Sequence, residues 1–411
     1  MAVSPSPTLA DSSGSTDSNC QCCVVGGGPA GVVLSFLLAR RGVAVTLLEA
    51  HQDFDRDFRG DTLHPSTMEL MDQLGLADAL LELPHTKLRT VSMQTPSETI
   101  TFADFNGLKS RFPFIVLMPQ SEFLKFLADE AAKYPNFKLI MGANVQELIH
   151  EDGLCVGVKY RTAEGSEECR APVTVACDGR FSKLRKLAGL TPVKTAPPMD
   201  VLWFRMPRNP DDGVDLTFRI NNGHMLVMLE RGDHWQLGYL IIKGSFHDVR
   251  EQGLEKFRES MAALAPELVD RLETITDWKQ ITPLNVEASR LTQWSKPGLL
   301  LIGDAAHVMS PVGGVGINYA VQDAIETANV LSEPLLKGNV TTADLDLVRK
   351  HREFPTKVIQ RFQEVIQKRI VQAGLDDSQT FHTPWFLKLP IIRNLPVRLI
   401  AFGVKRSQLK Q

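Results

Sequence analysis

Two stretches of the chain join a short apolar run to a glycine-rich turn and then to a helical pattern. The first, CCVVGGGPAGVVLSFLLARRGVAVTLLEA, predicts a buried strand at 22–25, a helix that runs to Arg41, and a second strand at 43–48. The second, LLIGDAAHVMSPVGGVGINYAVQDA, predicts a strand leading into Gly303 and a helix that begins near Gly316. Strands that alternate with helices in this way predict an α/β fold.

The middle of the chain carries two further patterns. The segment TVACDGRFSKLRKLAGL predicts a strand at 173–176, an Asp178–Gly179 turn and a helix at 182–187. From about residue 192 to 283, apolar residues alternate with polar ones and turn signals separate the runs. This region predicts an antiparallel meander followed by an amphipathic helix at about 254–264.

Composition narrows the class of protein. A chain of 411 residues is long enough for two substantial cores, and its net charge of −3 gives no pull toward nucleic acid. The six cysteines have no metal-ligand spacing and predict reduced thiols, so no metal is expected. The Ser/Pro/Asp-rich residues 1–19 predict a disordered leader rather than a secretory signal. No apolar run reaches the roughly 18 residues of a transmembrane helix, and we predict a cytoplasmic protein.

The first glycine loop has the spacing of a dinucleotide-binding turn. Gly26 permits a tight turn, Gly28 lets the backbone approach a pyrophosphate, and Gly31 lets helix and strand pack closely. Glu49 ends the second strand 18 residues after Gly31, where it can accept ribose hydroxyls. A glycine turn without a ligand would have no need of Glu49. The predicted contacts of this loop are Gly26, Gly28, Pro29, Ala30, Gly31 and Glu49.

The late glycine-rich stretch favours FAD over a nicotinamide as the bound dinucleotide, because FAD is longer and its flavin end needs a second holding element. Asp304 can accept from a ribityl hydroxyl, and the N–H groups at the start of the following helix can face the flavin's N1/C2 carbonyl edge. The predicted contacts on this side are Asp304, Gly314, Val315, Gly316, Ile317 and Asn318.

The motifs GGGPAG, DGRFSKLRK and GDAAHVMSPVGGVGIN, in this order, resemble those of the class A flavoprotein monooxygenases, the para-hydroxybenzoate hydroxylase family. The resemblance extends from about residue 20 to about 375. It implies a Rossmann-like FAD-binding domain, an antiparallel-sheet substrate domain and C-terminal helices. It also implies that Asp178 and Gly179 serve FAD and NAD(P)H, and that Arg59 and Gln120 contact FAD.

The chain departs from the family pattern at a few positions. Val315 stands where relatives often have Gln, and Cys177 replaces a commoner small residue. Ser66 stands where relatives often have Arg, and a capping box formed by Ser66 and Glu69 is the expected structural reason.

The resemblance divides the chain into five parts. They are a disordered leader at 1–19, the first part of the FAD-binding domain at 20–191, the substrate-binding sheet domain at 192–284, the second part of the FAD-binding domain at 285–345, and a C-terminal helical region with a basic-apolar tail at 346–411.

The implied function is hydroxylation of a lipophilic aromatic, quinone-like or polyketide-type substrate. NAD(P)H would reduce the flavin, O2 would form a flavin C4a-hydroperoxide, and Pro311 would be the wall beside it. The base is not assigned: His307 is interpreted as structural, and His64, His224 and Tyr239 are weaker candidates. The residues expected to line the substrate pocket are Trp203, Phe218, Met225, Met228 and Tyr239.

The signature motifs of other flavoprotein branches are absent from this sequence. No C-x-x-x-x-C redox pair, no Trp-x-Trp motif and no second dinucleotide fingerprint occurs. Two alternatives stay open: an FAD-dependent oxidoreductase without oxygen insertion, resembling a prenyl reductase, and a non-catalytic carrier of lipophilic cargo. The sequence leaves substrate identity, regiochemistry, NADH or NADPH preference and oligomeric state open.

The tail at 384–411 combines apolar residues with cations and has no acid. That composition predicts peripheral contact with a membrane surface. Pro390 and Pro396 interrupt a long helix, however, and the family's C-terminal helices commonly dock on the FAD-binding domain. Docking is therefore the alternative.

Overall fold

A six-stranded sheet forms the centre of the computed structural model, which describes residues 20–55, 61–209, 211–212, 216–376 and 390–410. All of its neighbouring strands run parallel except the antiparallel edge pair β20–β21. Its order is β20 (Ser295–Lys296), β21 (Leu299–Leu301), β12 (Val173–Ala176), β1 (Cys22–Val25), β2 (Val45–Glu49) and β8 (Phe137–Met141). The predicted α/β fold is confirmed.

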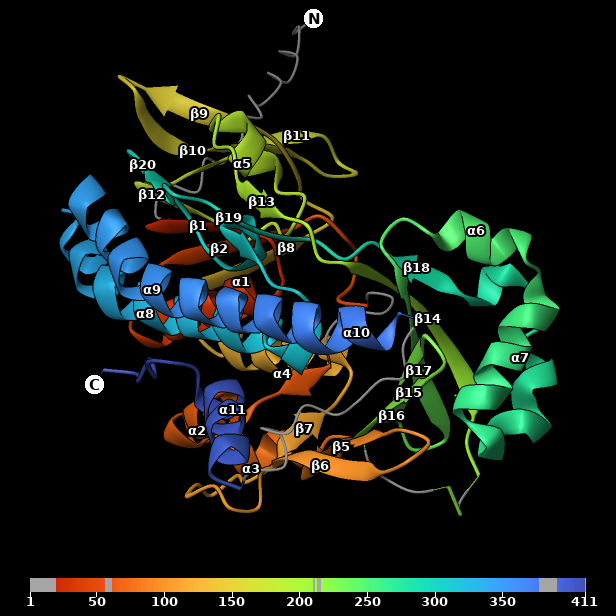
Figure 1. The fold of residues 1–411 in the computed structure, drawn as a ribbon. Helices are drawn as coiled ribbons and strands as arrows, with labels where there is room; N and C mark the ends of the chain where they lie inside the picture. The colour runs from red at the N-terminus through yellow and green to blue at the C-terminus, as the bar shows by residue number, and fades with distance from the viewer. Residues whose placement is uncertain (1–19, 56–60, 210, 213–215, 377–389, 411) are drawn as a thin grey trace, which may run out of the picture.

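The central strand β1 is short, and its four residues are buried on both faces. Strands covered on both sides by helices read as continuous apolar runs. Helix α1 (Pro29–Arg40) is also buried nearly all round and packs against α8 (Gly316–Lys337) and α4 (Gln120–Ala131). In Figure 1, α8 and α9 (Thr342–Ile366) run side by side across this layer.

A seven-stranded sheet forms the second layer, beside the first (Figure 1). Its order is β18 (Thr282–Leu284), β14 (Met199–Pro207), β17 (His234–Ile242), β16 (His224–Glu230), β15 (Leu216–Asn221), β5 (Thr90–Gln94) and β6 (Thr99–Asp104). The predicted meander is present as β14 to β17, and the predicted helix is α7 (Leu254–Leu264). The sequence did not reveal that β5 and β6 extend this sheet through a parallel pair with β15. That pairing joins residues more than a hundred positions apart, so no local pattern marks it. The domain boundaries themselves stay a prediction.

Smaller elements complete the fold. The small sheets contain β3 (Thr62–Leu63), β4 (Thr86–Leu88), β7 (Ile115–Leu117), β9 (Asn144–Glu151), β10 (Leu154–Arg161), β11 (Ser166–Arg170), β13 (Val193–Thr195), β19 (Ala288–Arg290) and β22 (His307–Val308). The remaining helices are α2 (Pro65–Gln73), α3 (Ala77–Leu80), α5 (Lys183–Leu187), α6 (Phe246–Glu251), α10 (Gln372–Gly374) and α11 (Pro390–Phe402). Five one- to three-turn segments are 3-10 or π helical: Pro266–Thr274, Trp278–Gln280, Gly303–Ala305, Val312–Gly314 and Gln367–Val371.

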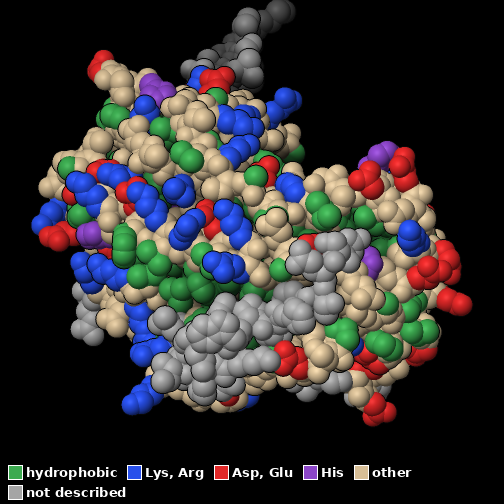
Figure 2. All heavy atoms as spheres, in the orientation of Figure 1, with side chains coloured by type: hydrophobic (Ala, Val, Ile, Leu, Met, Phe, Trp, Pro, Cys, Tyr) green, Lys and Arg blue, Asp and Glu red, His purple; other side chains and the backbone are tan. Residues whose placement is uncertain are grey.

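Lys and Arg side chains gather over α8 and α9 in Figure 2, whereas acidic side chains are more frequent over α6 and α7. Several of these cations are paired along their own helix, as Lys357 is with Glu353 at 2.6 Å. The face is therefore largely neutralised locally rather than a free cationic patch.

The described end of the chain docks on both layers. Helix α11 packs against α2 and β6, and its residues Val397, Ala401 and Phe402 are buried. Beyond it, Arg41 donates to the carbonyl of Lys410 at 2.6 Å. Within the described ranges, no helix is long and apolar enough to cross a membrane. The described apolar side chains of α11 thus face protein, as the docking alternative predicts. Residues 384–389 and 411 of the tail, and the side chains of residues 390–395, lie outside the described part of the chain.

Deleting residues 390–411 is expected to lower thermal stability without changing membrane binding. Burial of Val397 and Phe402 contributes roughly 1.5–3 kcal/mol for each side chain. Thermal unfolding and co-sedimentation with anionic liposomes would measure the two effects on the full and shortened chains. Loss of liposome binding at an unchanged melting temperature would restore the membrane interpretation.

Candidate functional site

The first glycine loop is shaped by contacts that exclude side chains. Gly26 has φ +106°, and a Cβ on it would lie 2.4 Å from the carbonyl oxygen of Cys177. A Cβ on Gly31 would lie 1.9 Å from the carbonyl oxygen of Gly26. At Gly28, by contrast, a Cβ would meet no atom of the described chain within 4 Å. The turn therefore leaves open space at the N-terminus of α1, where the helix dipole favours an anionic group.

Glu49 closes this loop from the end of β2. Its carboxylate is 6% exposed and accepts from the backbone N–H of Gly27 at 2.6 Å. The other oxygen accepts from the backbone N–H and the ring Nδ1 of His51, at 2.9 and 2.7 Å. These contacts fix the orientation of the carboxylate at the mouth of the loop.

The Asp178–Gly179 turn precedes α5. The carboxylate of Asp178 accepts from the Ser182 hydroxyl at 2.5 Å and from the backbone N–H groups of Lys183 and Leu184 at 2.7 and 3.0 Å. Burial raises the pKa of Asp178, and these hydrogen bonds oppose that shift. Asp178 thus anchors a short helix and shapes the turn.

Arg185 on α5 joins this turn to the late glycine-rich stretch. Its guanidinium donates to the carbonyl of Ala305 at 2.9 Å and to that of Arg180 at 2.6 Å. The structure therefore brings Asp178 and Asp304, which are far apart in the sequence, to the same region. The sequence signal for Arg185 was its place on the helix of the second motif.

Of the two remaining predicted FAD contacts, Gln120 lies within the described residues. Gln120 is the first residue of α4, beside Asp61. Asp61 pairs at 2.6 Å with Arg231 from the β16–β17 turn, which links the two layers. Arg59 lies outside the described residues.

The flavin-side turn predicted from the sequence runs into α8. Gly313 and Gly314 have φ +79° and +61°, and α8 begins at Gly316. The carbonyl of Gly314 accepts from the Thr62 hydroxyl at 2.8 Å. His64 is fully buried, and its Nε2 lies 3.0 Å from the same carbonyl while its Nδ1 lies 2.8 Å from the carbonyl of Ile400 in α11. The C-terminal helix is thus connected to this turn through one imidazole ring.

Asn318, in the first turn of α8, has an unused donor. Its side-chain oxygen accepts from the hydroxyls of Ser66 and Thr67, and it is 1% exposed. Its Nδ2 has no hydrogen-bond partner among the described residues. Buried amides are normally satisfied, so this donor fits a site that is completed by a bound group. The capping box predicted for Ser66 and Glu69 is wrong, because Pro65 begins α2 and Ser66 lies within the helix and faces Asn318.

A buried ionic cluster joins α8 and α9 to the segment after β21. Asp323 on α8 accepts from His307 Nε2 at 2.6 Å, from the backbone N–H of Gly303 at 3.0 Å and from Arg352 on α9 at 2.7 Å. Burial raises the pKa of Asp323, but the charges of His307 and Arg352 outweigh it and hold the pKa below its usual value. This buried pair agrees with the structural interpretation of His307, which stays a prediction.

The predicted pocket residues do not share one surface. Trp203, Phe218 and Met225 lie on the side of the seven-stranded sheet that also contacts Val312 in the loop before α8. A Cβ on Gly238 would lie 2.9 Å from the Trp203 ring, so glycine there makes room for the indole.

Met228 and Tyr239 lie on the opposite side of the sheet, packed against Phe257 of α7. Tyr239 also donates to Ser260 of α7 at 3.0 Å and its oxygen lies 2.6 Å from His224. The expectation that all five residues line one pocket is therefore wrong. Side chains alternate between the faces of a strand, and Met225 and Met228 are an odd number of positions apart.

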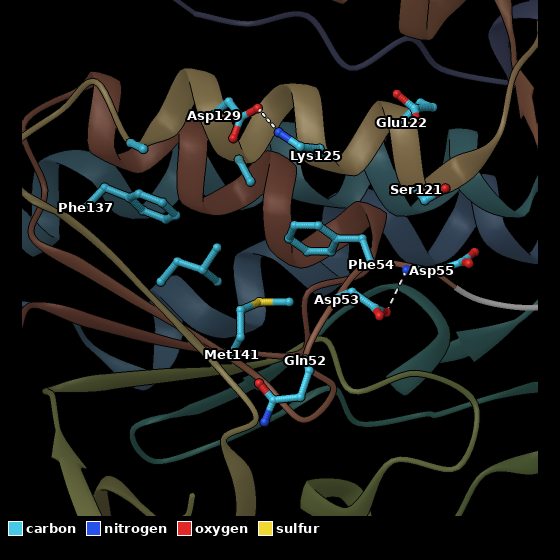
Figure 3. A pocket seen from close by; sticks show the side chains of 13 residues that line it. Gln52, Asp53, Phe54, Asp55, Ser121, Glu122, Lys125, Asp129, Phe137 and Met141 are labelled. Atoms are coloured by element: carbon cyan, nitrogen blue, oxygen red, sulfur yellow. Dashed lines mark hydrogen bonds and ion pairs between the residues drawn. The ribbon is translucent and has the colours of Figure 1, made fainter. Parts of the chain in front are cut away.

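A cavity of about 750 Å³ opens near the end of β2. Figure 3 shows Phe54 and Phe137 beneath α4, with the Lys125–Asp129 ion pair above them. Phe54 also approaches Gly27 of the first glycine loop. The cavity combines an apolar floor with a polar rim and adjoins the first glycine loop. The part of the chain that the structure describes contains no cluster of three or more His, Cys, Asp or Glu residues suited to a metal ion.

Comparison with known proteins identifies the family. A family model described as FAD binding domain matches residues 19–362. 6-Methylpretetramide 4-monooxygenase of Streptomyces rimosus is 32% identical over 385 residues, which cover 93% of this chain and 92% of that protein. The chain belongs to the FAD-dependent monooxygenases. Monooxygenases of this family use NAD(P)H as cosubstrate.

Solved structures agree with this family at the level of the fold. PqsL of P. aeruginosa, in complex with 2-aminobenzoylacetate, has a TM-score of 0.75 at 16% identity and covers 87% of this monooxygenase and 97% of its own chain. OxyS anhydrotetracycline hydroxylase of Streptomyces rimosus has a TM-score of 0.70 at 22% identity, with coverages of 93% and 75%. At these identities the likeness shows the fold alone.

The stability of this monooxygenase is expected to depend on His64 between pH 6.5 and 4. Burial lowers the pKa of His64 from 6.5 to about 4, and its two carbonyl contacts oppose the shift. Unfolded His64 therefore binds a proton over this window while the folded ring stays neutral, so stability is complete above pH 6.5 and falls by up to about 3 kcal/mol as the pH approaches 4.

Urea unfolding at several pH values would measure this dependence. The variant His64→Asn should lose less stability over the window than the wild type. The matched control His247→Asn, at a side chain that is 80% exposed, should keep the wild-type slope. Parallel slopes for His64→Asn and the wild type would contradict the assignment.

Proposed function

We propose that this FAD-dependent monooxygenase hydroxylates a lipophilic aromatic compound of the polyketide type. The observation that carries the proposal is the 32% identity, over nearly the full length of both chains, to a protein named for 4-monooxygenation of 6-methylpretetramide. The apolar side of the sheet that carries the partly buried Trp203, Phe218 and Val227 supports it, because a lipophilic polycyclic substrate needs such a surface. The relatives named above give no support to a reductase or a cargo carrier.

In this proposal, the first glycine loop and the Asp178 turn hold the adenosine and pyrophosphate parts of FAD. The open space at Gly28 and the N-terminus of α1 support it. The residues assigned here are Gly26, Gly28, Pro29, Ala30, Gly31, Glu49, Gln120, Asp178 and Gly179, and Arg59 stays a prediction from the resemblance.

The flavin end is assigned to the late stretch. The buried, unpartnered Nδ2 of Asn318 and the N-terminus of the 22-residue helix α8 support this part of the proposal. The residues assigned are Asp304, Gly314, Val315, Gly316, Ile317 and Asn318.

When bound, FAD would accept a hydride from NAD(P)H and activate O2 for transfer of one oxygen atom to the substrate. The residues of this chain would position the substrate and exclude water. Pro311 and Val312 would separate the flavin edge from solvent, and the substrate would lie between them and the side of the sheet that carries Trp203, Phe218 and Met225. The proposal includes the route that the family resemblance implies, in which the oxygen atom would reach the substrate from the C4a position of the flavin.

The catalytic base stays unassigned. His307 is held by Asp323 in a buried pair, and Tyr239 with His224 faces α7. Burial raises the pKa of Tyr239 to about 12, which also makes it a poor base near neutral pH.

The visible spectrum under anaerobic conditions would test the function. The purified protein should be yellow, and NADH or NADPH should bleach it faster in the presence of a suitable polycyclic phenol than alone. Under ¹⁸O2, the product should then gain one labelled oxygen atom. Product formation without O2, or without label, would reject the proposed hydroxylation, and a panel of analogues lacking the phenol hydroxyl would serve as control.

Two residues on one strand offer a matched test of the substrate surface. Val227→Ala should raise KM for the aromatic substrate about tenfold, because it removes apolar contact from a partly exposed side chain on the proposed side. Met228→Ala should instead cost about 2–5 kcal/mol of stability, because its side chain packs in the core under α7, and should leave KM unchanged. Steady-state kinetics and urea unfolding distinguish them, and equal KM values for the two variants would place the substrate elsewhere.

A further inference from the structure

Three glutamines form a buried row on the helical segment that begins with α9. Gln360 and Gln363 lie in α9, and Gln367 begins the π turn that continues it. Their spacing of three and four residues places them on one side of the helix. They are 5%, 2% and 4% exposed, although glutamine is ordinarily a surface residue.

The amide groups of two of these glutamines donate to backbone carbonyls around Pro311. Gln360 Nε2 donates to the carbonyls of Ser289 and Val308 at 2.9 and 3.1 Å. Gln363 Nε2 donates to the carbonyls of Ser310 and Val312 at 2.8 and 2.7 Å.

The third glutamine, Gln367, donates from its Nε2 to the Ser310 hydroxyl oxygen. Five hydrogen bonds from this row of side chains therefore connect the helical segment to β19 and to the loop at 308–312. The strand pairing of β22 ends at Val308, and Pro311 has no backbone N–H to donate, so the carbonyl groups of this loop need partners from elsewhere.

The same helical segment contacts the substrate-facing side of the sheet at its other end. Val371, the last residue of the π turn, packs in the cluster that contains Met225. A Cβ on Gly374 would lie 2.7 Å from the sulfur of Met225, so the backbone of α10 rests directly on that side chain. Figure 1 shows the end of this long helix beside β14. π turns within helices frequently occur at functional sites.

We propose that Gln360, Gln363 and Gln367 are positioning residues that fix the Pro311 loop relative to the substrate-facing sheet. The inference rests on the proposed function, in which this loop leads into the turn that faces the flavin. An amide is suited to the task because it donates two hydrogen bonds without bringing a charge into the interior. The Oε1 atom of Gln363 has no hydrogen-bond partner among the described residues. The side chain is therefore oriented so that its Nε2 donates to the loop while its acceptor stays unsatisfied.

A loosened loop would hold the N-terminus of α8 less firmly against the pyrimidine edge of the flavin. Fixed dipoles at that edge favour the anionic reduced form, and their effect depends on their being held in place. Removing one of the amides should therefore weaken the binding of reduced FAD more than that of oxidised FAD. A merely structural role would lower stability and leave this ratio unchanged.

The test uses the full-length holoenzyme and the isosteric variant Gln363→Met. The affinity ratio of reduced to oxidised FAD should fall about tenfold, which lowers the two-electron midpoint potential by about 30 mV. Potentiometric titration of the bound flavin measures the potential, and product formed per NAD(P)H consumed should fall with it. The control Gln372→Met, an exposed glutamine in α10, should keep the wild-type potential.

A milder pair keeps the test decisive if Gln363→Met does not fold. Gln367→Met and Ser310→Ala each remove the same hydrogen bond, so their effects on the potential should be less than additive in the double variant. Wild-type potentials in Gln363→Met and Gln367→Met, or additive shifts in the double variant, would overturn the inference. Failure of the wild type to hydroxylate any aromatic substrate would reject the proposed function instead, while a lowered potential in the variants would still support the positioning role.

Discussion

The carboxylate of Asp323 is the group on which the packing of the late glycine-rich segment against α8 and α9 depends. It is fully buried, and it accepts from the backbone of Gly303, from His307 and from Arg352. A buried carboxylate is tolerated only when its partners replace water, and each partner here comes from a different element. The ion cluster therefore determines how the turn after β21, helix α8 and helix α9 meet. Arg352 is itself 1% exposed, so removal of Asp323 would leave an unpaired cation in the core.

The proposed FAD site is consequently assembled from segments that meet only in the folded chain. The first glycine loop follows β1, the Asp178 turn follows β12, and the late turn follows β21, and these three strands are adjacent in the sheet. Because they are parallel, their carboxyl ends lie at one edge, where ligands of open α/β sheets bind. Arg185 connects the Asp178 turn to the turn after β21. His64 connects the turn at Gly314, just before α8, to the C-terminal helix α11.

Local patterns in the sequence predicted what depends on neighbouring residues. The strands at 22–25 and 173–176 have the predicted bounds, because their apolar runs are short and end at glycine or aspartate turns. The start of α8 near Gly316 was also predicted, from the glycines before it. The pairing of β5 with β15, the partners of Asp323 and the glutamine row on α9 depend on distant segments, so no window of sequence reveals them. The opposite orientation of Met225 and Met228 could have been predicted, since three positions along a strand reverse the face.

The contact between Gly238 and Trp203 has a consequence for how such a protein can diverge. The indole lies over a position without a side chain, on the strand next to its own, and a Cβ there would come within 2.9 Å of the ring. Any larger residue at 238 would tilt the indole, and the surface offered to a ligand would change shape. Position 238 is far from the glycine loops in the sequence and belongs to the other sheet. Selection for a new ligand can therefore act on one small residue while the elements proposed to hold the cofactor stay as they are.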